Sequence, residues 1–292
     1  MLIVASPIKR PYIWDVGAAR SAIRYCLDRQ LSVHLIEWKS ATRGHGNAGF
    51  DEYADHAISE CVARTGDRTG RQKPFLMGHS LGGTLATIYA AVHPQTLQGV
   101  VLLGAPLCFE RGVSRFGDAL VSIVPSTLAD ADVIPGSLLS QVSALASPRT
   151  FVWERLVDTL LGTADPRAMA IHTQVERWAL DEVPLPGRLV HEIVEWLYRD
   201  DRFCRGILPI GGKKIGPACL RSPVLAVVNA VDEIAPPASV TRFADAMADR
   251  SVRIIAYPGE FGVGLQHVAL LVGRKAYDQV WPEVIAWLKA HR

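Results

Sequence analysis

Short apolar runs alternate along the chain with longer segments whose apolar residues recur at helical spacing. The mostly apolar runs cover residues 2–5, 31–38, 74–77, 100–103, 224–229 and 252–257. Helical periodicity covers residues 16–30 and 53–63, and it returns after residue 80 until Pro94 stops it. Apolar strands separated by helices predict an α/β protein whose mostly parallel sheet is covered by helices on both faces.

The alternation is lost between Pro106 and Arg221. This segment has a mostly helical pattern, interrupted by Pro or Gly at positions 125, 135–136, 148, 166, 184 and 186–187. We expect residues 107–220 to form a helical cap, or lid, and residues 1–106 and 221–292 to form the core. The alternative is a separate domain with its own function.

A glycine-rich motif joins the third apolar run to the helical segment that follows it. The motif reads Gly78-His79-Ser80-Leu81-Gly82-Gly83 and matches the G-x-S-x-G nucleophile elbow of α/β-hydrolases. Gly78 and Gly82 suit a turn in which backbone meets backbone, and the helix N-terminus favours a developing negative charge. The motif predicts that Ser80 is a nucleophile, unless it is a chance match in a loop.

A serine nucleophile needs a base, and the base needs an acid that orients it, in the chain order Ser…Asp/Glu…His. Asp232 follows the apolar run 224–229 and precedes a Pro-rich turn, where this fold places its acid; Glu233 is the alternative. His267 follows the last apolar run through a Gly-rich loop. We therefore expect Ser80, Asp232 and His267 to form a catalytic triad.

The tetrahedral intermediate of such a reaction needs two N–H donors. One donor is expected from Leu81, the residue after the nucleophile. The second is expected from the loop after the first strand, and because Pro7 has no N–H, Ile8 is the candidate.

The other histidines do not add a second site to this picture. We interpret His79 as a pocket or packing residue beside the nucleophile. The remaining seven are interpreted as surface or packing residues: His34, His45, His56, His93, His172, His191 and His291. No metal-ligand spacing stands out among them, so no metal is expected.

Composition narrows the class of protein. The chain has 292 residues, 49% of them hydrophobic, and a net charge of +2, which argues against general nucleic-acid binding. No run of 18 apolar residues exists, so no membrane span is expected, and the short apolar N-terminus is interpreted as a strand without a leader. The five scattered cysteines (Cys26, Cys61, Cys108, Cys204, Cys219) are expected to be reduced thiols in a cytoplasmic protein.

Several stretches, taken in order, resemble the catalytic domain of polyhydroxyalkanoate synthases. They are residues 11–15, 21–25, 36–38, 176–187, 197–200, 206–208, 210–212, 222–225, 267, 272–276, 281–282 and 287–288. The resemblance covers nearly the whole chain but lacks the family's long N-terminal region. The first two strands of an α/β-hydrolase, which form an edge hairpin, are expected to be missing here.

The elbow departs from that family in its nucleophile. The family's elbow is G-x-C-x-G, whereas this chain has Ser80; the family's aspartate and histidine match Asp232 and His267. Leu265-Gln266 stands where the family commonly has Gly-Gly before the histidine. A serine forms a more stable oxygen ester than the family's thioester, which puts polymerisation in doubt but not acyl-enzyme chemistry.

These observations predict a serine hydrolase or acyltransferase that acts on hydroxyacyl esters or thioesters. One alternative is a polyhydroxyalkanoate synthase that uses serine, and another is a catalytically silent granule-associated or subunit protein. No bound cofactor is expected, with coenzyme A entering only as part of a thioester substrate. The resemblance adds a polyester granule and a homodimer as candidate partners beside the small-molecule substrate.

The cap carries many large apolar residues. They are expected either to pack under the lid or to line an acyl tunnel, and they are Phe151, Trp153, Leu156, Leu160, Leu161, Trp178 and Trp196.

Overall fold

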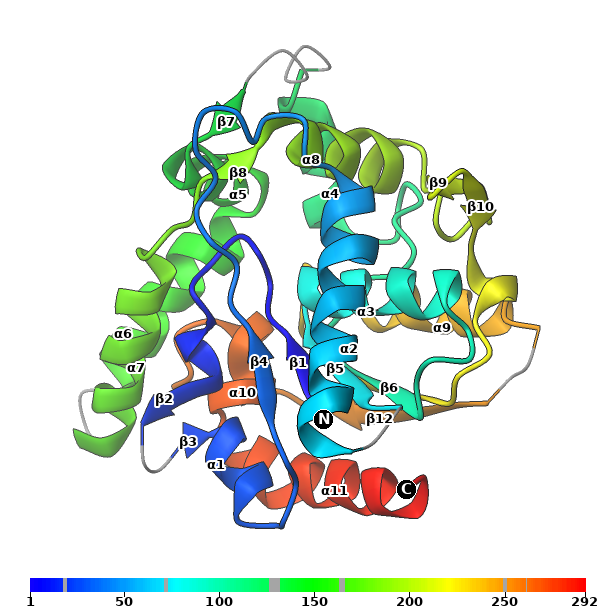
Figure 1. Ribbon diagram of the computed structural model, residues 1–292. Coiled ribbons are helices and arrows are strands. Elements are labelled where there is room, and N and C mark those ends of the chain that lie inside the picture. Colours follow the sequence, from blue (N-terminus) through cyan, green and yellow to red (C-terminus); the bar gives the residue numbers. More distant parts are fainter. Residues whose placement is uncertain (18–19, 71–72, 126–131, 163–165, 249–250, 261) are drawn as a thin grey trace.

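A six-stranded sheet forms the centre of the molecule (Figure 1). The computed structural model describes residues 1–292 except 18–19, 71–72, 126–131, 163–165, 249–250 and 261. The strands of the sheet are β1 (Leu2–Val4), β4 (His34–Ile36), β5 (Phe75–His79), β6 (Gly99–Leu103), β11 (Val224–Asn229) and β12 (Val252–Tyr257). Their order is β12-β11-β6-β5-β1-β4, and every neighbouring pair is parallel. The predicted α/β class, the mostly parallel sheet and all six apolar strands are confirmed.

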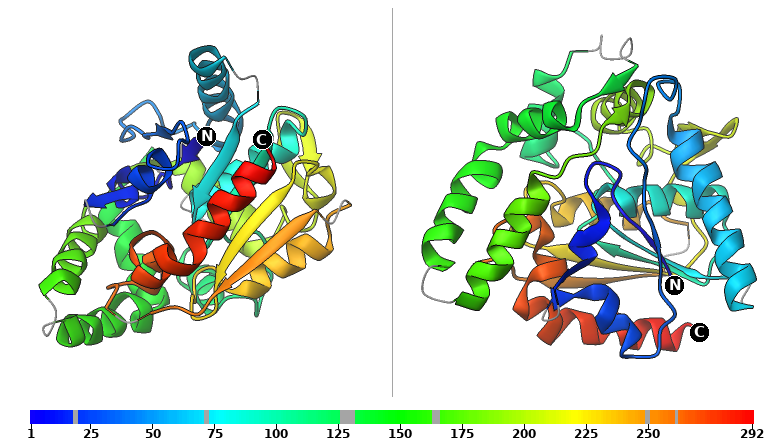
Figure 2. Two further views of the ribbon diagram at one scale, coloured as in Figure 1. Left: turned by 90° about the horizontal axis from the view of Figure 1, so that it is seen from below. Right: turned by 60° about the vertical axis from the view of Figure 1, so that its left-hand side comes forward.

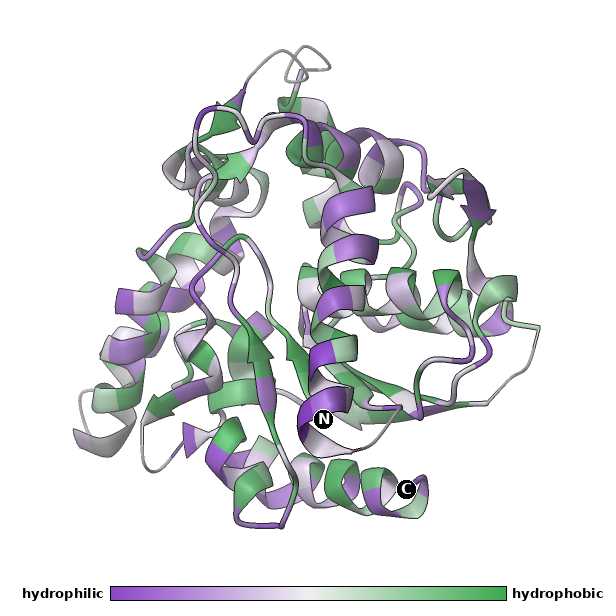
Figure 3. Cartoon of the chain, in the orientation of Figure 1, coloured by the Kyte–Doolittle hydropathy of each residue, from purple (hydrophilic) through white to green (hydrophobic). Residues whose placement is uncertain are grey.

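Both faces of the sheet are covered by helices. On β5, Leu76 belongs to an apolar cluster with residues of α2, α3 and α9, whereas Met77 belongs to a second cluster with residues of α1, α10 and α11. Figure 2 shows α11 lying across one face, and Figure 3 shows that strands β1 and β4 are mostly hydrophobic. Burial of both faces explains why the central strands β1, β5, β6 and β11 are almost wholly apolar and do not alternate. The edge strand β12 differs, because it buries Ile255 and Tyr257 but leaves Arg253, Ile254 and Ala256 exposed. These helices are α1 (Ala22–Leu27), α2 (Ala57–Thr69), α3 (Leu81–Val92), α9 (Pro237–Asp245), α10 (Ala269–Val272) and α11 (Trp281–Ala290).

The segment predicted as a cap is largely helical and lies at the top and left of Figure 1. We call residues 107–220 the cap segment. Its helices are α4 (Arg115–Ile123), α5 (Gly136–Ala146), α6 (Glu154–Gly162), α7 (Pro166–Ala179) and α8 (Gly187–Glu192). Two small antiparallel ribbons accompany them, β7 (Val133–Ile134) with β8 (Leu185–Pro186) and β9 (Leu208–Ile210) with β10 (Lys213–Ile215).

The predicted helix over residues 16–30 is wrong in its first half. Residues Asp15–Gly17 (β2) and Arg20–Ser21 (β3) pair as an antiparallel ribbon, and only Ala22–Leu27 is helical. The side chain of Ser21 accepts a hydrogen bond from the N–H of Arg24 at 2.9 Å. This cap satisfies an N–H at the helix start and sets the boundary there.

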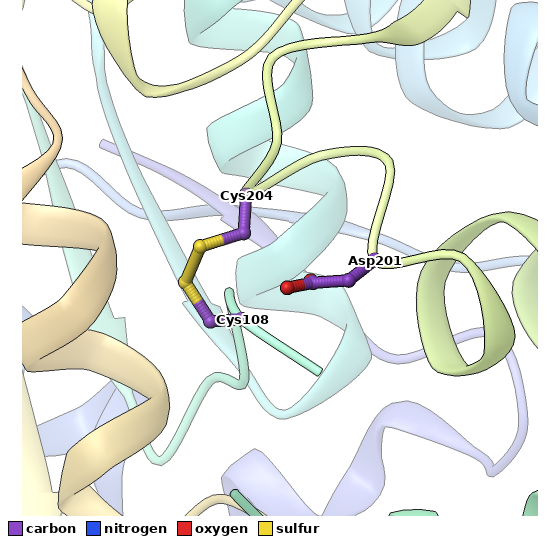
Figure 4. A group of neighbouring side chains, drawn as sticks. All are labelled: Cys108, Asp201 and Cys204. Atoms are coloured by element: carbon purple, nitrogen blue, oxygen red, sulfur yellow. A yellow bond between two sulfur atoms is a disulfide. The ribbon is translucent and has the colours of Figure 1, made fainter. Parts of the chain in front are cut away.

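The prediction that all cysteines are reduced thiols is wrong for two of them. Cys108, in the loop after β6, forms a disulfide with Cys204, 96 residues further along the chain (Figure 4). Cys26, Cys61 and Cys219 are free. The disulfide links the loop after a core strand to the end of the cap segment, so the argument for a cytoplasmic location from reduced cysteines no longer holds.

Candidate active site

Ser80 occupies a strained turn between β5 and α3. Its backbone has φ +54° and ψ −136°, a conformation that residues other than glycine rarely adopt. Neighbouring backbone holds it there: the N–H of Ser80 donates to the carbonyl of Leu103 at 3.2 Å, and the N–H groups of Gly83 and Thr84 donate to the carbonyl of Ser80 at 2.9 and 3.2 Å. The turn places Ser80 at the carboxyl end of a central strand, where sheets of this class bind ligands.

The glycines of the motif allow the close packing of this turn. A Cβ on Gly78 would lie 2.5 Å from the Cα of Gly83, and a Cβ on Gly82 would lie 2.2 Å from the carbonyl oxygen of Val4. Both contacts are to backbone atoms, whose displacement would cost more energy than that of a flexible side chain. The elbow and the loop after β1 are therefore packed backbone against backbone.

Asp232 and His267 lie together although 35 residues separate them. Oδ2 of Asp232 is 2.7 Å from Nδ1 of His267, and Oδ1 accepts hydrogen bonds from the N–H groups of Ile234 and Ala235 at 2.9 and 3.2 Å. Burial by itself would raise the pKa of Asp232, but His267 and the two amides outweigh it, so the pKa lies below its usual range. The carboxylate is thus held ionised against the imidazole.

The other ring nitrogen of His267 is available for chemistry. Nε2 is buried and has no hydrogen-bond partner among the described residues, Ser80 included. Because Nδ1 faces a carboxylate, it carries the proton, and Nε2 of the neutral ring is then the lone-pair nitrogen. A buried nitrogen without a partner suits a base that acts only when substrate is present.

Asn229 supports the pair of Asp232 and His267, and sequence reasoning missed this role. The side-chain amide of Asn229 donates to the carbonyl of Gln266 at 2.9 Å and accepts from the N–H of Val231 at 3.2 Å. It therefore joins the loop of Asp232 to the loop of His267. The signal was present in the sequence, since Asn229 is the one polar residue that ends an otherwise apolar strand.

His79 packs beneath His267, in keeping with the packing interpretation. Its Nε2 lies 2.7 Å from the backbone carbonyl of His267, and the two rings are 4.7 Å apart. Burial, together with the neighbouring His267, lowers the pKa of His79 to about 3. His79 is therefore neutral and donates its Nε2–H to the chain that carries the candidate base.

The candidate oxyanion donors lie on two adjacent segments. Leu81 is the first residue of α3, where N–H groups have no partner within the helix. The loop after β1 passes next to it, because β1 pairs with β5 and the backbone of Ala5 and Ser6 abuts Gly82. Ile8 follows in that loop, and its carbonyl accepts a hydrogen bond from the N–H of Val183 in the cap segment at 3.3 Å.

Side chains of the same loop are also tied to the cap segment. The ammonium of Lys9 contacts Ser140 at 2.9 Å and Glu182 at 3.7 Å, and burial lowers its pKa against the effect of Glu182. The indole N–H of Trp178 donates to the carbonyl of Arg10 at 2.7 Å. The loop after β1 is therefore held by the last turn of α7 and the residues that follow it.

Glu233, the alternative acid, faces the cap segment and not His267. Its carboxylate accepts hydrogen bonds from the hydroxyls of Ser147 and Thr150 at 2.9 and 3.0 Å, and Arg149 lies 3.6 Å away. Adjacent residues thus have separate contacts: Asp232 meets the imidazole, and Glu233 anchors the cap segment.

The large apolar residues of the cap segment fall into two groups. Trp178 is buried, and Phe151 and Trp196 are partly buried and pack against core clusters. Trp153, Leu156 and Leu160 are exposed by 64%, 52% and 72%. The side chain of Leu161 lies outside the described residues. The exposed three do not line an interior tunnel in this conformation.

One group of side chains among the described residues has the spacing of metal ligands. Cys108, Asp201 and Cys204 offer ligand atoms within 4.8 Å of one another (Figure 4). The two sulfur atoms are bonded to each other, so they are not available as thiolate ligands in this structure. Across the described residues, no helix is both long and apolar enough to cross a membrane.

Comparison with known proteins identifies the class. The model of the family described as alpha/beta hydrolase fold matches residues 22–259, so the chain belongs to that family. This fold, together with the polymerase relatives described below, identifies the protein as an enzyme. Solved structures agree on the fold. A monoacylglycerol lipase of Paleococcus ferrophilus superposes with a TM-score of 0.63 at 18% identity, covering 100% of this chain and 94% of that one. An esterase of Thermogutta terrifontis gives 0.56 at 14% identity, covering 99% and 89%.

Within that class, the chain is similar to poly(3-hydroxyalkanoate) polymerase subunits named PhaC. It is 28% identical to that of Haloferax mediterranei over 98% of this chain and 58% of the relative, and 27% identical to that of Haloarcula marismortui over 98% and 60%. Identity to the Allochromatium vinosum subunit is 25% over 99% and 80%. The chain thus spans about three-fifths of the first two relatives, and these similarities support a polyhydroxyalkanoate synthase-like protein.

Proposed function

We propose that the protein is a serine hydrolase or acyltransferase that acts on hydroxyacyl esters or thioesters through an acyl-enzyme. One observation carries the proposal. Ser80 lies at a strained elbow. Asp232 occupies Nδ1 of His267, and Nε2 is buried and has no hydrogen-bond partner in the part of the chain that the structure describes. The similarity to PhaC subunits supports hydroxyacyl groups as the acyl part of the substrate.

The proposed reaction begins with Ser80. Its Oγ attacks the substrate carbonyl carbon while Nε2 of His267 takes the hydroxyl proton, and Asp232 stabilises the imidazolium that forms. The carbonyl oxygen becomes an oxyanion, held by the N–H of Leu81 and the N–H of Ile8. When the tetrahedral intermediate collapses, His267 returns the proton to the leaving alkoxide or thiolate, which leaves Ser80 acylated.

The second half of the cycle decides between hydrolysis and transfer. Water attacks the carbonyl carbon of the acyl-serine while His267 accepts a proton from it. The bond between the acyl carbon and Oγ of Ser80 then breaks, His267 returns the proton to Oγ, and free hydroxyacid leaves. An oxygen ester is less reactive toward an incoming hydroxyl than the thioester that the family's cysteine would form, so we propose water as the final acceptor. A synthase that uses serine is the second candidate, because the whole chain is similar to polymerase subunits.

The test supplies 3-hydroxybutyryl-coenzyme A and separates free acid from oligomer. We expect free acid and free thiol from the natural protein, neither from Ser80→Ala, and more oligomer from Ser80→Cys, because a thiol is the better nucleophile at neutral pH. Long polymer from the natural protein would favour the synthase. A catalytically silent protein would release no coenzyme A and would resist labelling by a serine-directed fluorophosphonate.

Further parts of the proposal rest on the resemblance alone. No bound cofactor is needed, and coenzyme A enters only as the leaving group of a thioester. We propose a polyester granule and a second copy of the chain as partners. Co-sedimentation with granules tests the first, and light scattering tests the homodimer. We also propose a lid role for residues 107–220, from their helical pattern, and a cytoplasmic location, which fractionation of cells tests.

A further inference from the structure

The loop that carries His267 is held from the cap segment by one buried carboxylate. Asp158, on α6, is 4% exposed. Its Oδ1 accepts a hydrogen bond from the N–H of Gly262 at 3.1 Å, and its Oδ2 accepts one from the N–H of Gly264 at 2.8 Å. Each oxygen thus binds a different amide of the same loop, which fixes the position of that loop and its orientation.

A second helix of the cap segment, α7, packs against the same part of the loop, at Gly264. A Cβ on Gly264 would lie 3.1 Å from Nδ1 of His172 and 3.3 Å from Cγ1 of Val175. His172 is 4% exposed, and its Nε2 pairs with the hydroxyl of Thr159 on α6 at 2.8 Å. The backbone of Gly264 is therefore clamped between the carboxylate of α6 and the side chains of α7.

The loop is rich in glycine and has a described tie of its own, from the side-chain amide of Gln266 to the carbonyl of Glu260 at 2.6 Å, so contacts from outside matter. Gly259, Gly262 and Gly264 all have positive φ, at +78°, +83° and +75°. Glycine gives such a loop many accessible conformations, so contacts from outside must select one. Gly264 precedes His267 by only three residues, so a shift of the clamped amide is transmitted to the imidazole.

We propose that Asp158 is a positioning residue for His267, so that the cap segment, when seated, sets the geometry of the candidate base. The proposal rests on the proposed function for the role of His267. Asp158 touches neither Ser80 nor a reacting atom. It acts through the two loop amides, and displacement of α6 would release them and loosen the base. The cap segment would then control turnover as well as access.

The test compares Asp158→Asn with Glu176→Gln. The first variant keeps the shape of the side chain but removes its charge and one acceptor oxygen. The control removes the charge of the carboxylate that pairs with Arg155 between α6 and α7, with Oε1 2.7 Å from Nε of Arg155, and that makes no described hydrogen bond to the loop. Its nearest approach to the clamp is the 4.0 Å between Oε1 and Nε2 of His172, and a glutamine of the same shape fills the same space. We expect Asp158→Asn to lower kcat by about 10-fold to 100-fold with little change in KM, because small misplacements of a reacting group have effects of that size. Glu176→Gln should change kcat by less than about two-fold.

Two measurements that need no substrate test the positioning role of Asp158 independently of the proposed function. Asp158→Asn should speed amide hydrogen exchange over residues 262–267 and should broaden or move the low-field proton NMR signal of the Asp232–His267 hydrogen bond. If the natural protein hydrolyses no hydroxyacyl substrate, these measurements still test the positioning. Unchanged exchange and an unchanged signal in a folded Asp158→Asn variant would overturn it, as would an equal loss of kcat in the Glu176→Gln control.

Discussion

The elbow and the loop of His267 carry the candidate nucleophile and the candidate base, but they are held in different ways. The elbow is held mainly by backbone, since Gly78 and Gly82 bring three segments of main chain into contact. The histidine loop is rich in flexible glycine and is held by side chains from elsewhere, namely Asn229 of the core and Asp158 of the cap segment. The candidate nucleophile thus lies in a turn formed by the core, whereas the loop of the candidate base is also contacted by the cap segment.

The largest expected effect is the difference in kcat between variants of two neighbouring carboxylates, Asp232 and Glu233. Asp232→Asn should lower kcat by about 10³-fold to 10⁴-fold, because an amide in place of the carboxylate favours the wrong imidazole tautomer. Glu233→Gln should lower kcat by about 10-fold or less and reduce thermal stability, because it weakens the anchor to Ser147, Thr150 and Arg149 and leaves the contact of Asp232 with His267 in place. Steady-state kinetics and melting curves of both variants measure this. A larger loss from Glu233→Gln would exchange the roles of the two residues.

Glycine substitutions test the two modes of support directly. Gly82→Ala should destabilise the protein by about 3 kcal/mol or more, because its Cβ meets the rigid carbonyl of Val4 at 2.2 Å. Gly264→Ala should cost about 1–2 kcal/mol, mostly from positive φ, because its nearest neighbours at 3.1 and 3.3 Å are side-chain atoms of His172 and Val175. Denaturant unfolding gives both values. Equal costs would mean that the cap side chains around Gly264 are as rigid as the elbow backbone.

Breaking the disulfide should loosen the cap without altering the elbow. The Cys108→Ser, Cys204→Ser double variant should lose about 2–4 kcal/mol of stability, because the bond closes a loop of 96 residues. The natural protein in reductant should melt at the same lower temperature, and the double variant should not respond to reductant. Two free thiols at these positions in protein purified without reductant would contradict the disulfide.

The smallest effect concerns the carboxyl beside that disulfide. Burial raises the pKa of Asp201 to about 6, whereas its ordinary value is 3.8. An acid with a raised pKa in the folded state binds its proton more tightly there, so ionisation destabilises the fold above pH 6, and the cost disappears as the pH falls below 4. Asp201→Asn keeps an acceptor for the N–H of Phe109 and tolerates the positive φ of 49°.

That variant should therefore be more stable than the natural protein at pH 8 by about 1 kcal/mol, with solvent screening included, and equally stable near pH 4. Thermal unfolding across this range measures the difference. A variant that is less stable at pH 8 would show that the ionised carboxylate is fully compensated by its hydrogen bonds to the loop after β6.

Local patterns were sufficient for much of the fold. The six strands, the helix that follows Ser80 and its end before Pro94 were all predicted, because apolar runs and glycine or proline signals act over a few residues. The prediction failed over residues 16–30, where the side chain of Ser21 starts the helix later than periodicity indicates. The sequence also proposed Asp232 and His267 from their order after the last two strands, but it left Glu233 open.

Residues close together in the chain encode the strand–helix alternation and the elbow, so sequence patterns predict both. The order of the candidate triad was predicted from the position of each residue after a separate apolar run. Packing between distant segments settled which carboxylate meets His267, that Cys108 pairs with Cys204, and that Asp158 binds the histidine loop 104 to 106 residues away. These contacts join residues far apart along the chain. A single sequence contains no periodicity that records such contacts, because they exist only after the sheet has formed and the cap segment has packed against its carboxyl edge.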